Sequence, residues 1–228
     1  SDIHISAIMP ARNAARHLGR SLDALRSSLP ENAELIVVDD ASTDNTPELA
    51  GSRNATVYRV AKQAGPSQAR NLGASKARGD YLMFVDSDVA VHPDAVSRAS
   101  DTLDRHPEWA AVFGSYDDRP AETDTVSQYR NLLHHCTHQR GNPDAFTFWA
   151  GCGLIRKSVF EAMNGFDARR FPRSSIEDIE LGYRLRDAGH RIRLDGSMLC
   201  THLKRWTVAS MARTDLVCRA VPWARLNA

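Results

Sequence analysis

The chain has 228 residues, of which 42% are hydrophobic and 25% are charged, a composition typical of a globular protein with one sizeable core. Its formal net charge of +1 excludes the strongly basic surface of a nucleic-acid-binding protein, so we expect no nucleic-acid partner. There is no apolar run near the ~20 residues of a membrane span, no signal-peptide pattern and no CxxC pair. We therefore expect a cytoplasmic protein without a zinc site or a disulfide framework.

Short apolar runs alternate with helical patterns through the first hundred residues. We predict strands at 3–9, 35–39, 56–60 and 81–85, and helices at 14–28, 43–51 and 67–77. This alternation favours an α/β fold with a mostly parallel, doubly wound (Rossmann-like) sheet. Ligands bind such sheets beyond the carboxyl ends of the strands, where polar clusters follow three of the predicted strands.

The second half of the chain has a more irregular pattern. We predict a helix at 93–105, a strand at 110–116, a polar loop with a helix at 117–144 and a strand at 146–155. A helix at 177–188 ends at Gly189, and short strands follow at 191–194 and 198–201. We expect one domain over residues 1–206, with halves at 1–116 and 117–206. The segment 207–228 is expected to be helical as far as Pro222.

Asp86-Ser87-Asp88 directly follows the buried strand pattern YLMFV. Two carboxylates one residue apart at a strand end repel each other, and a divalent cation relieves that repulsion. Carboxylates suit Mg²⁺ or Mn²⁺, which would also hold a diphosphate. An isolated DxD is equally explained by a solvated, helix-capping turn, and only its surroundings favour the metal site.

Two further features belong to the same sheet edge. Asp39-Asp40 ends the second predicted strand, and one of these carboxylates could accept a hydrogen bond from a nucleotide base or a ribose hydroxyl. Arg70 lies in a helix opened by Gly65-Pro66 and could donate to a nucleotide or to the acidic cluster. A surface position for Arg70 explains the sequence equally well.

The last candidate residues follow the predicted strand 146–155. Glu177-Asp178 begins a helix, where acids gain from the helix dipole, or where one could act as a general base. His202 leads into a basic, aromatic stretch in which Arg205 could bind phosphate and Trp206 could stack on a sugar.

Taken in order, these motifs resemble glycosyltransferase family 2. The resemblance covers residues 3–206 and rests on PARN at 10–13, VDDASTD at 38–44, ARNLG at 69–73, DSD at 86–88, GCG at 151–153 and ED at 177–178. It implies the GT-A fold, with a nucleotide-binding half at 1–116 and an acceptor-binding half at 117–206. It also implies an inverting transfer from a UDP- or GDP-linked sugar to a saccharide, a lipid-linked or another hydroxyl acceptor.

The resemblance implies roles residue by residue. Asp178 would be the catalytic base, with Glu177 supporting it or binding acceptor. Asp88 would be the main metal ligand, with Asp86 touching ribose or a metal-bound water. The implied donor pocket comprises Pro10, Arg12, Asp39, Asp40 and Arg70, and Gly151 would lie in the loop that borders the acceptor.

His202-Leu203-Lys204-Arg205-Trp206 resembles the QxxRW motif of processive, membrane-bound family 2 synthases, with histidine in place of glutamine. That difference argues against processivity and makes His202 a candidate ligand of metal or phosphate. The segment 207–228 carries a broken apolar stripe that fits either the inner face of a membrane or a packed helix at a domain or subunit interface. Self-association stays open.

Two other classes compete with this interpretation. A nucleotidyltransferase would need a glycine-rich, lysine-bearing loop after the first strand, which Pro10-Ala11-Arg12-Asn13 does not supply. A sugar-nucleotide-binding module without activity would explain the same pockets, although all the acidic positions are present.

Overall fold

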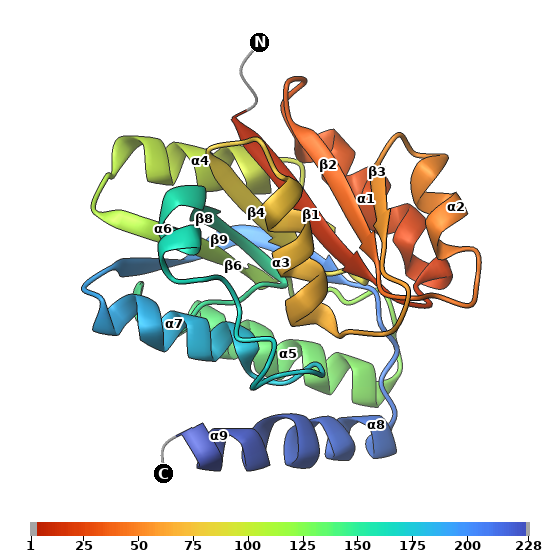
Figure 1. Ribbon diagram of the computed structural model, residues 1–228. Coiled ribbons are helices and arrows are strands. Elements are labelled where there is room, and N and C mark those ends of the chain that lie inside the picture. Colours follow the sequence, from red (N-terminus) through yellow and green to blue (C-terminus); the bar gives the residue numbers. More distant parts are fainter. Residues whose placement is uncertain (1–3, 227–228) are drawn as a thin grey trace.

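The computed structural model describes residues 4–226, which form a twisted sheet covered by helices on both faces (Figure 1). The strand order is β3-β2-β1-β4-β8-β6-β9-β5, with β7 paired to β9. The strands are β1 (Ile5–Ala11), β2 (Glu34–Asp39), β3 (Thr56–Arg59), β4 (Tyr81–Val85), β5 (Val89–Val91), β6 (Trp109–Tyr116), β7 (Asp144–Ala145), β8 (Cys152–Arg156) and β9 (Arg191–His202). The predicted α/β class with its doubly wound N-terminal half is confirmed.

The first four strands, β1 to β4, pair in parallel, as expected for strands that alternate with helices. The other half of the sheet is mixed: β8 is antiparallel to both β4 and β6, whereas β9 is parallel to β6. The short strand β5 pairs antiparallel with the end of β9. This last pairing places residue 202 beside residue 89, next to the acidic cluster.

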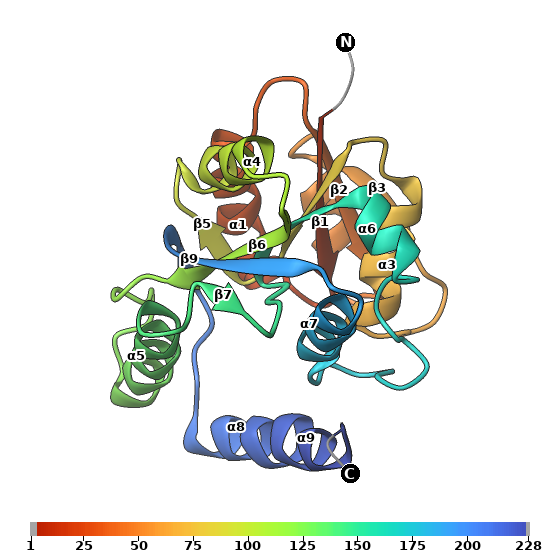
Figure 2. The same cartoon turned by 90° about the vertical axis from the view of Figure 1, so that its left-hand side faces the viewer.

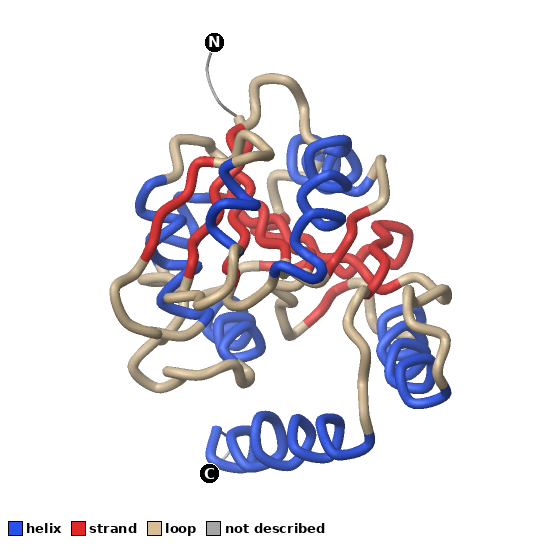
Figure 3. The backbone as a smooth tube through the Cα atoms, turned by 90° about the vertical axis from the view of Figure 1, so that its right-hand side faces the viewer, coloured by secondary structure: helices blue, strands red, loops and turns tan. Residues whose placement is uncertain are grey.

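Helices lie on both sides of the sheet (Figure 3), and their buried apolar side chains form two core layers. One core layer contains α1 (Ala15–Ser28), α2 (Thr46–Gly51) and α4 (Ala95–Arg105). The opposite layer contains α3 (Pro66–Lys76), α6 (Lys157–Ala162) and α7 (Glu177–Asp187). The helix α5 (Thr125–Gln139) packs on β6. These layers leave the carboxyl ends of β1, β2 and β4 open at one edge.

Some predicted boundaries were wrong. The strand expected at 146–155 begins only at Cys152, because residues 146–151 form a loop that turns Phe148 into the core. The two strands expected at 191–194 and 198–201 form the single strand β9, which pairs with β6 at 191–194 and again at 199–200, on either side of an irregularity around Gly196. The helix expected at 43–51 begins at Thr46, after a turn in which Asp44 accepts hydrogen bonds from Thr46.

The C-terminal segment lies across the open side of the molecule, away from the sheet (Figure 2). It consists of α8 (Val208–Arg213), a π-helical turn η1 (Thr214–Ala220) and α9 (Val221–Leu226). The prediction that helix would end at Pro222 was wrong: the segment stays helical to Leu226, and Pro222 lies in α9, directly after the π-helical turn η1. None of the described helices is long and apolar enough to cross a membrane.

Candidate active site

The sheet edge that the sequence pointed to is hollowed into three adjoining cavities. The Asp40 cavity, of about 570 Å³, extends from Pro10 and Arg12 to Asp88. The His202 cavity, of about 310 Å³, contains Asp86, Asp88 and His202, and the Asp178 cavity, of about 460 Å³, contains Arg70 and Asp178. Asp86 lines all three, so the acidic cluster sits where the cavities meet.

Arg70 holds the acidic residues of two distant segments together. Its Nη2 lies 2.6 Å from Oδ1 of Asp86, and its Nη1 lies 3.0 Å from Oε1 of Glu177. The guanidinium is buried, so these ion pairs are shielded from water and their attraction is strong. Arg70 is therefore an internal clamp between β4 and α7 rather than a surface residue.

Asp178 is the carboxylate that the clamp leaves without a cation partner of its own. It accepts a hydrogen bond from the Ala150 amide at 3.2 Å, which fixes the loop 146–151 against the start of α7. Burial and the adjacent Glu177 charge raise the pKa of Asp178 to about 6, although Arg70 opposes the shift. A carboxylate with a pKa near neutrality is suited to take up a proton during a reaction.

Asp86 and Asp88 differ in their surroundings. Burial and the Asp88 charge raise the pKa of Asp86, although Arg70 acts against them. Burial also disfavours ionised Asp88, but His202 and Lys204 outweigh it and lower the pKa of Asp88. Nε2 of His202 lies 3.8 Å from Oδ2 of Asp88, and the Leu203 amide donates to the Asp88 carbonyl.

A divalent cation at this place would find few protein ligands. The part of the chain that the structure describes, residues 4–226, contains no cluster of three or more His, Cys, Asp or Glu side chains arranged for a metal. Mg²⁺ and similar ions are commonly held by one or two carboxylates together with substrate phosphates and water. Asp88 and Asp86, crowded at the meeting point of the cavities, fit that second arrangement.

The residues expected to bind a nucleotide fall into two groups. Pro10, Arg12 and Asp40 line the Asp40 cavity, and the Asp40 carboxylate also accepts hydrogen bonds from the Ala64 and Gly65 amides. Asp39 is completely buried, ion-paired to Arg59 at 3.0 Å, and lines none of these three cavities. Asp39 thus supports the loop rather than facing a ligand.

Three other predictions change in detail. Arg205 lies 3.7 Å from Asp124 and lines none of the three cavities, whereas its neighbour Lys204 lines two of them. Trp206 is buried and lines the His202 cavity as expected. Gly151 contributes its backbone carbonyl, which accepts the Asp86 amide at 3.2 Å and so fixes the acidic turn.

Several residues of the site carried no recognisable signal in the sequence. Tyr116, His134 and Trp149 form an aromatic cluster with His202, in which the rings of Tyr116 and His202 stack 4.6 Å apart. Arg130 and Arg219 reach the same cavities from α5 and from the C-terminal segment. The sequence predicted a polar loop with a helix at 117–144, and no spacing in it distinguished these side chains from surface residues.

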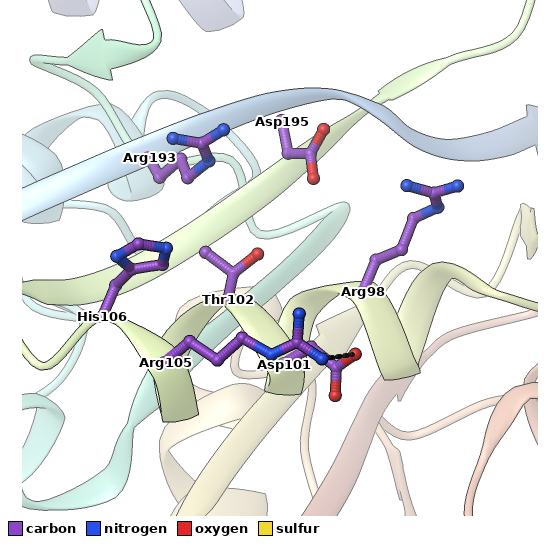
Figure 4. A pocket seen from close by; sticks show the side chains of 7 residues that line it. All are labelled: Arg98, Asp101, Thr102, Arg105, His106, Arg193 and Asp195. Carbon is purple, nitrogen blue, oxygen red and sulfur yellow. Dashed lines mark ion pairs between the residues drawn. The ribbon is translucent and has the colours of Figure 1, made fainter.

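A separate cavity of about 230 Å³ lies between α4 and β9 (Figure 4). It is lined by Arg98, Asp101, Thr102, Arg105, His106, Arg193 and Asp195. Arg105 and Asp101 form an ion pair within the helix, and Arg98 pairs with Asp94. The cavity contains none of the acidic residues that follow β2 and β4, so it is not part of the candidate active site.

Comparison with known proteins supports the interpretation drawn from this geometry. The family model for glycosyl transferase family 2 matches residues 6–163. The glycosyltransferase GlyG of Streptococcus pneumoniae is 32% identical over 185 residues, which cover 73% of this chain and 61% of that protein. The chain spans between 40% and 61% of the length of GlyG and two uncharacterized glycosyltransferases of Haemophilus influenzae.

Solved structures show the same fold. The mannosyltransferase PcManGT from Pyrobaculum calidifontis, in complex with GDP-Man and Mn²⁺, superimposes with a TM-score of 0.75 at 20% identity over 98% of this chain and 64% of that one. Staphylococcus aureus TarS 1–349 with UDP-GlcNAc gives a TM-score of 0.69 at 20% identity, over 92% of this chain and 61% of that one. The chain therefore belongs to glycosyl transferase family 2 and has the GT-A fold.

Proposed function

We propose that this chain is an inverting glycosyltransferase that moves a sugar from a nucleoside-diphosphate sugar to a hydroxyl acceptor. The observation that carries the proposal is the separation of two kinds of carboxylate within one continuous site. Asp88 lies at the Asp40 cavity with a lowered pKa, and Asp178 lies in the neighbouring cavity with a pKa raised to about 6. The family membership favours sugar transfer over nucleotidyl transfer.

The Asp40 cavity is the proposed donor pocket. At one end, Asp40 would accept a hydrogen bond from the nucleotide base or the ribose. At the other end lie the neighbouring carboxylates of Asp86 and Asp88. Arg12 and Lys204 line it and would attract the diphosphate. UDP-GlcNAc and GDP-Man in the two structurally similar proteins support a nucleotide-sugar donor for this chain.

Asp178 is proposed as the general base. Its ionised carboxylate would accept the proton of the acceptor hydroxyl, whose oxygen forms the new bond to the anomeric carbon. The bond from that carbon to the diphosphate breaks, and the electron pair leaves with the β-phosphate oxygen. Direct displacement by an acceptor on the opposite side of the sugar inverts the anomeric configuration.

We further propose that Mn²⁺ or Mg²⁺ binds at Asp88, with Asp86 and His202 as its protein neighbours. Such a cation would neutralise the charge that develops on the departing diphosphate. Among the chain's own residues, Lys204 supplies fixed positive charge near Asp88, and Arg70 holds the Asp86 carboxylate in place. The Mn²⁺ in the PcManGT complex supports this assignment.

The test incubates the protein with a panel of UDP- and GDP-sugars and a mixture of saccharide and lipid-linked acceptors. Turnover is measured as release of the nucleoside diphosphate. We expect one donor class to react, with Mn²⁺ or Mg²⁺ but not with EDTA. Release of pyrophosphate from nucleoside triphosphates would identify a nucleotidyltransferase instead. Donor binding without turnover on any acceptor would identify a binding module without activity.

A further inference from the structure

The Asp178 cavity contains positive charge that the proposed chemistry does not use. Arg130, from α5, and Arg219, from η1, line both this cavity and the adjoining His202 cavity. Arg130 is buried and pairs with Asp215 at 2.7 Å. Within residues 4–226, Arg219 has no carboxylate within 4 Å. Arg219 is exposed to solvent, so its guanidinium is open to a ligand from outside.

Two buried polar atoms without partners belong to residues that line the His202 cavity with these two arginines. The Nδ1 atom of His134 and the Nε1 atom of Trp206 are both buried and have no hydrogen-bond partner in the described structure. Burial, together with His138 and Arg219, lowers the pKa of His134 well below its usual value, so its ring is neutral. An indole N–H can only donate, and a buried donor is satisfied only when an acceptor atom arrives. The wall is therefore arranged for a ligand rich in oxygen atoms and carrying negative charge.

These cations reach the His202 cavity beside Asp86 and Asp88, but they do not line the proposed donor pocket. Neither Arg130 nor Arg219 lines the Asp40 cavity, where Lys204 and Arg213 supply the positive charge. Both arginines instead line the cavity of Asp178 together with Trp149, whose indole is an apolar surface for a sugar ring. Because the Asp178 cavity contains the proposed base, their position there favours the acceptor as their ligand.

We propose that the acceptor is anionic: a phosphate or carboxylate of the acceptor binds between Arg130 and Arg219 while its reacting hydroxyl faces Asp178. This inference rests on the proposed function, because it assigns the acceptor to the Asp178 cavity. Guanidinium groups bind carboxylate and phosphate oxygens through paired, charge-assisted hydrogen bonds. The unpartnered indole N–H of Trp206 would donate to a remaining oxygen, as would Nδ1 of His134 in the tautomer that carries its proton there.

The experiment compares matched acceptors with the donor found in the turnover panel. The pairs are glucose 6-phosphate with glucose, glucuronic acid with glucose, and glycerol 3-phosphate with glycerol. For at least one pair we expect kcat/KM to be about 10-fold or more higher for the anionic member. The phosphate and carboxylate pairs separately show which anion is preferred.

The variant Arg219→Gln removes the cation and keeps a polar side chain of similar length. We expect it to lower kcat/KM for the anionic acceptor about 10- to 100-fold more than for the neutral member, without raising the KM for the donor. Arg219→Lys should restore part of the loss. Arg225→Gln is the matched control, because Arg225 is an exposed arginine of the same segment that lines none of the three cavities.

Three outcomes would overturn the inference: equal use of anionic and neutral acceptors, an unchanged preference in Arg219→Gln, or a rise in donor KM with every acceptor. The last would show that Arg219 binds the diphosphate. Titration calorimetry with the same anionic compounds does not need turnover. If no donor reacts, the proposed function fails by itself, and equal binding of these compounds to wild type and Arg219→Gln would separately refute the anion site.

Discussion

Arg70 and Glu177 are 107 positions apart in the chain, yet Nη1 of Arg70 lies 3.0 Å from Oε1 of Glu177 inside the protein. Oε2 of Glu177 accepts the Ser175 amide, so both carboxylate oxygens are occupied. Glu177 is thereby committed to holding α7 against the acidic cluster. Asp178, the next residue, accepts the Ala150 and Ile179 amides but has no cation within 4 Å in the described part of the chain, which favours it over Glu177 as the proposed base.

The Arg70 clamp should contribute strongly to stability. In Arg70→Met, Asp86 and Glu177 lose their shared partner, and we expect the free energy of unfolding to fall by about 3–5 kcal/mol. Urea denaturation followed by circular dichroism measures this. Arg105→Met removes an exposed ion pair within one helix and should cost less than about 1 kcal/mol. Equal losses in the two variants would contradict the clamp.

Replacing Asp178, the proposed base, should greatly lower the rate of sugar transfer. Asp178→Asn keeps an oxygen for the Ala150 amide but cannot accept the proton, so we expect sugar transfer to fall about 10²- to 10⁴-fold. Nucleoside-diphosphate release measures the rate. Asp187→Asn, at an exposed position of the same helix, is the control and should leave the rate unchanged. Wild-type turnover in Asp178→Asn would disprove the base assignment.

The same variant should be more stable than wild type at neutral pH. Because folding raises the pKa of Asp178 from 3.8 to about 6, the folded state keeps the proton more tightly, and stability is lost as pH rises through about 6. Asparagine cannot ionise, so we expect Asp178→Asn to gain about 1–3 kcal/mol over wild type at pH 7 and little at pH 4. Urea denaturation at both pH values tests this, and a pH-independent difference would contradict it.

The raised pKa also predicts the pH dependence of the reaction. Only ionised Asp178 accepts a proton, so kcat/KM should rise with pH, with a midpoint near 6, and level off above it. Initial rates from pH 4.5 to 8.5 at saturating metal give the profile. A midpoint near the ordinary aspartate value of 3.8 would show that the base is more exposed to water than this structure has it.

Asp88 should determine the metal response. In Asp88→Asn, we expect the donor KM to rise about 10- to 100-fold and the stimulation by Mn²⁺ to disappear, because the amide replaces a charged ligand. Initial rates over a Mn²⁺ series measure both effects. The control Asp118→Asn changes an exposed aspartate and should respond to Mn²⁺ like wild type. Unaltered Mn²⁺ stimulation in Asp88→Asn would refute the metal assignment.

The C-terminal segment 208–226 should matter for binding more than for folding. None of its residues is buried, but Ser210, Arg213, Thr214 and Cys218 line the Asp40 cavity. We expect a chain ending at Thr207 to unfold cooperatively with nearly unchanged free energy but to show a raised donor KM. A chain ending at Arg225 keeps these residues and serves as the control. Loss of cooperative unfolding would show that the segment belongs to the domain core.

The sequence by itself determined the α/β class, the buried strands β1, β2 and β4, and the polar residues that follow them. Local patterns are sufficient there, because a parallel strand is a continuous apolar run and its carboxyl end must meet the ends of its neighbours. Asp40, Asp86 and Asp88 were found in this way, at the edge of the sheet where the structure has them.

Only the tertiary structure decided which residues from the second half join that edge. The antiparallel pairing of β5 with β9 aligns Val89 with His202 and so sets the histidine beside Asp88. The turn at Lys204 and Arg205 then directs the lysine to the cavities and the arginine to Asp124, although their sequence context is nearly the same. Arg130 and Arg219 likewise meet only because α5 and the C-terminal segment lie on the same side of the site. Such long-range pairings depend on how the whole chain packs, and no local periodicity encodes them.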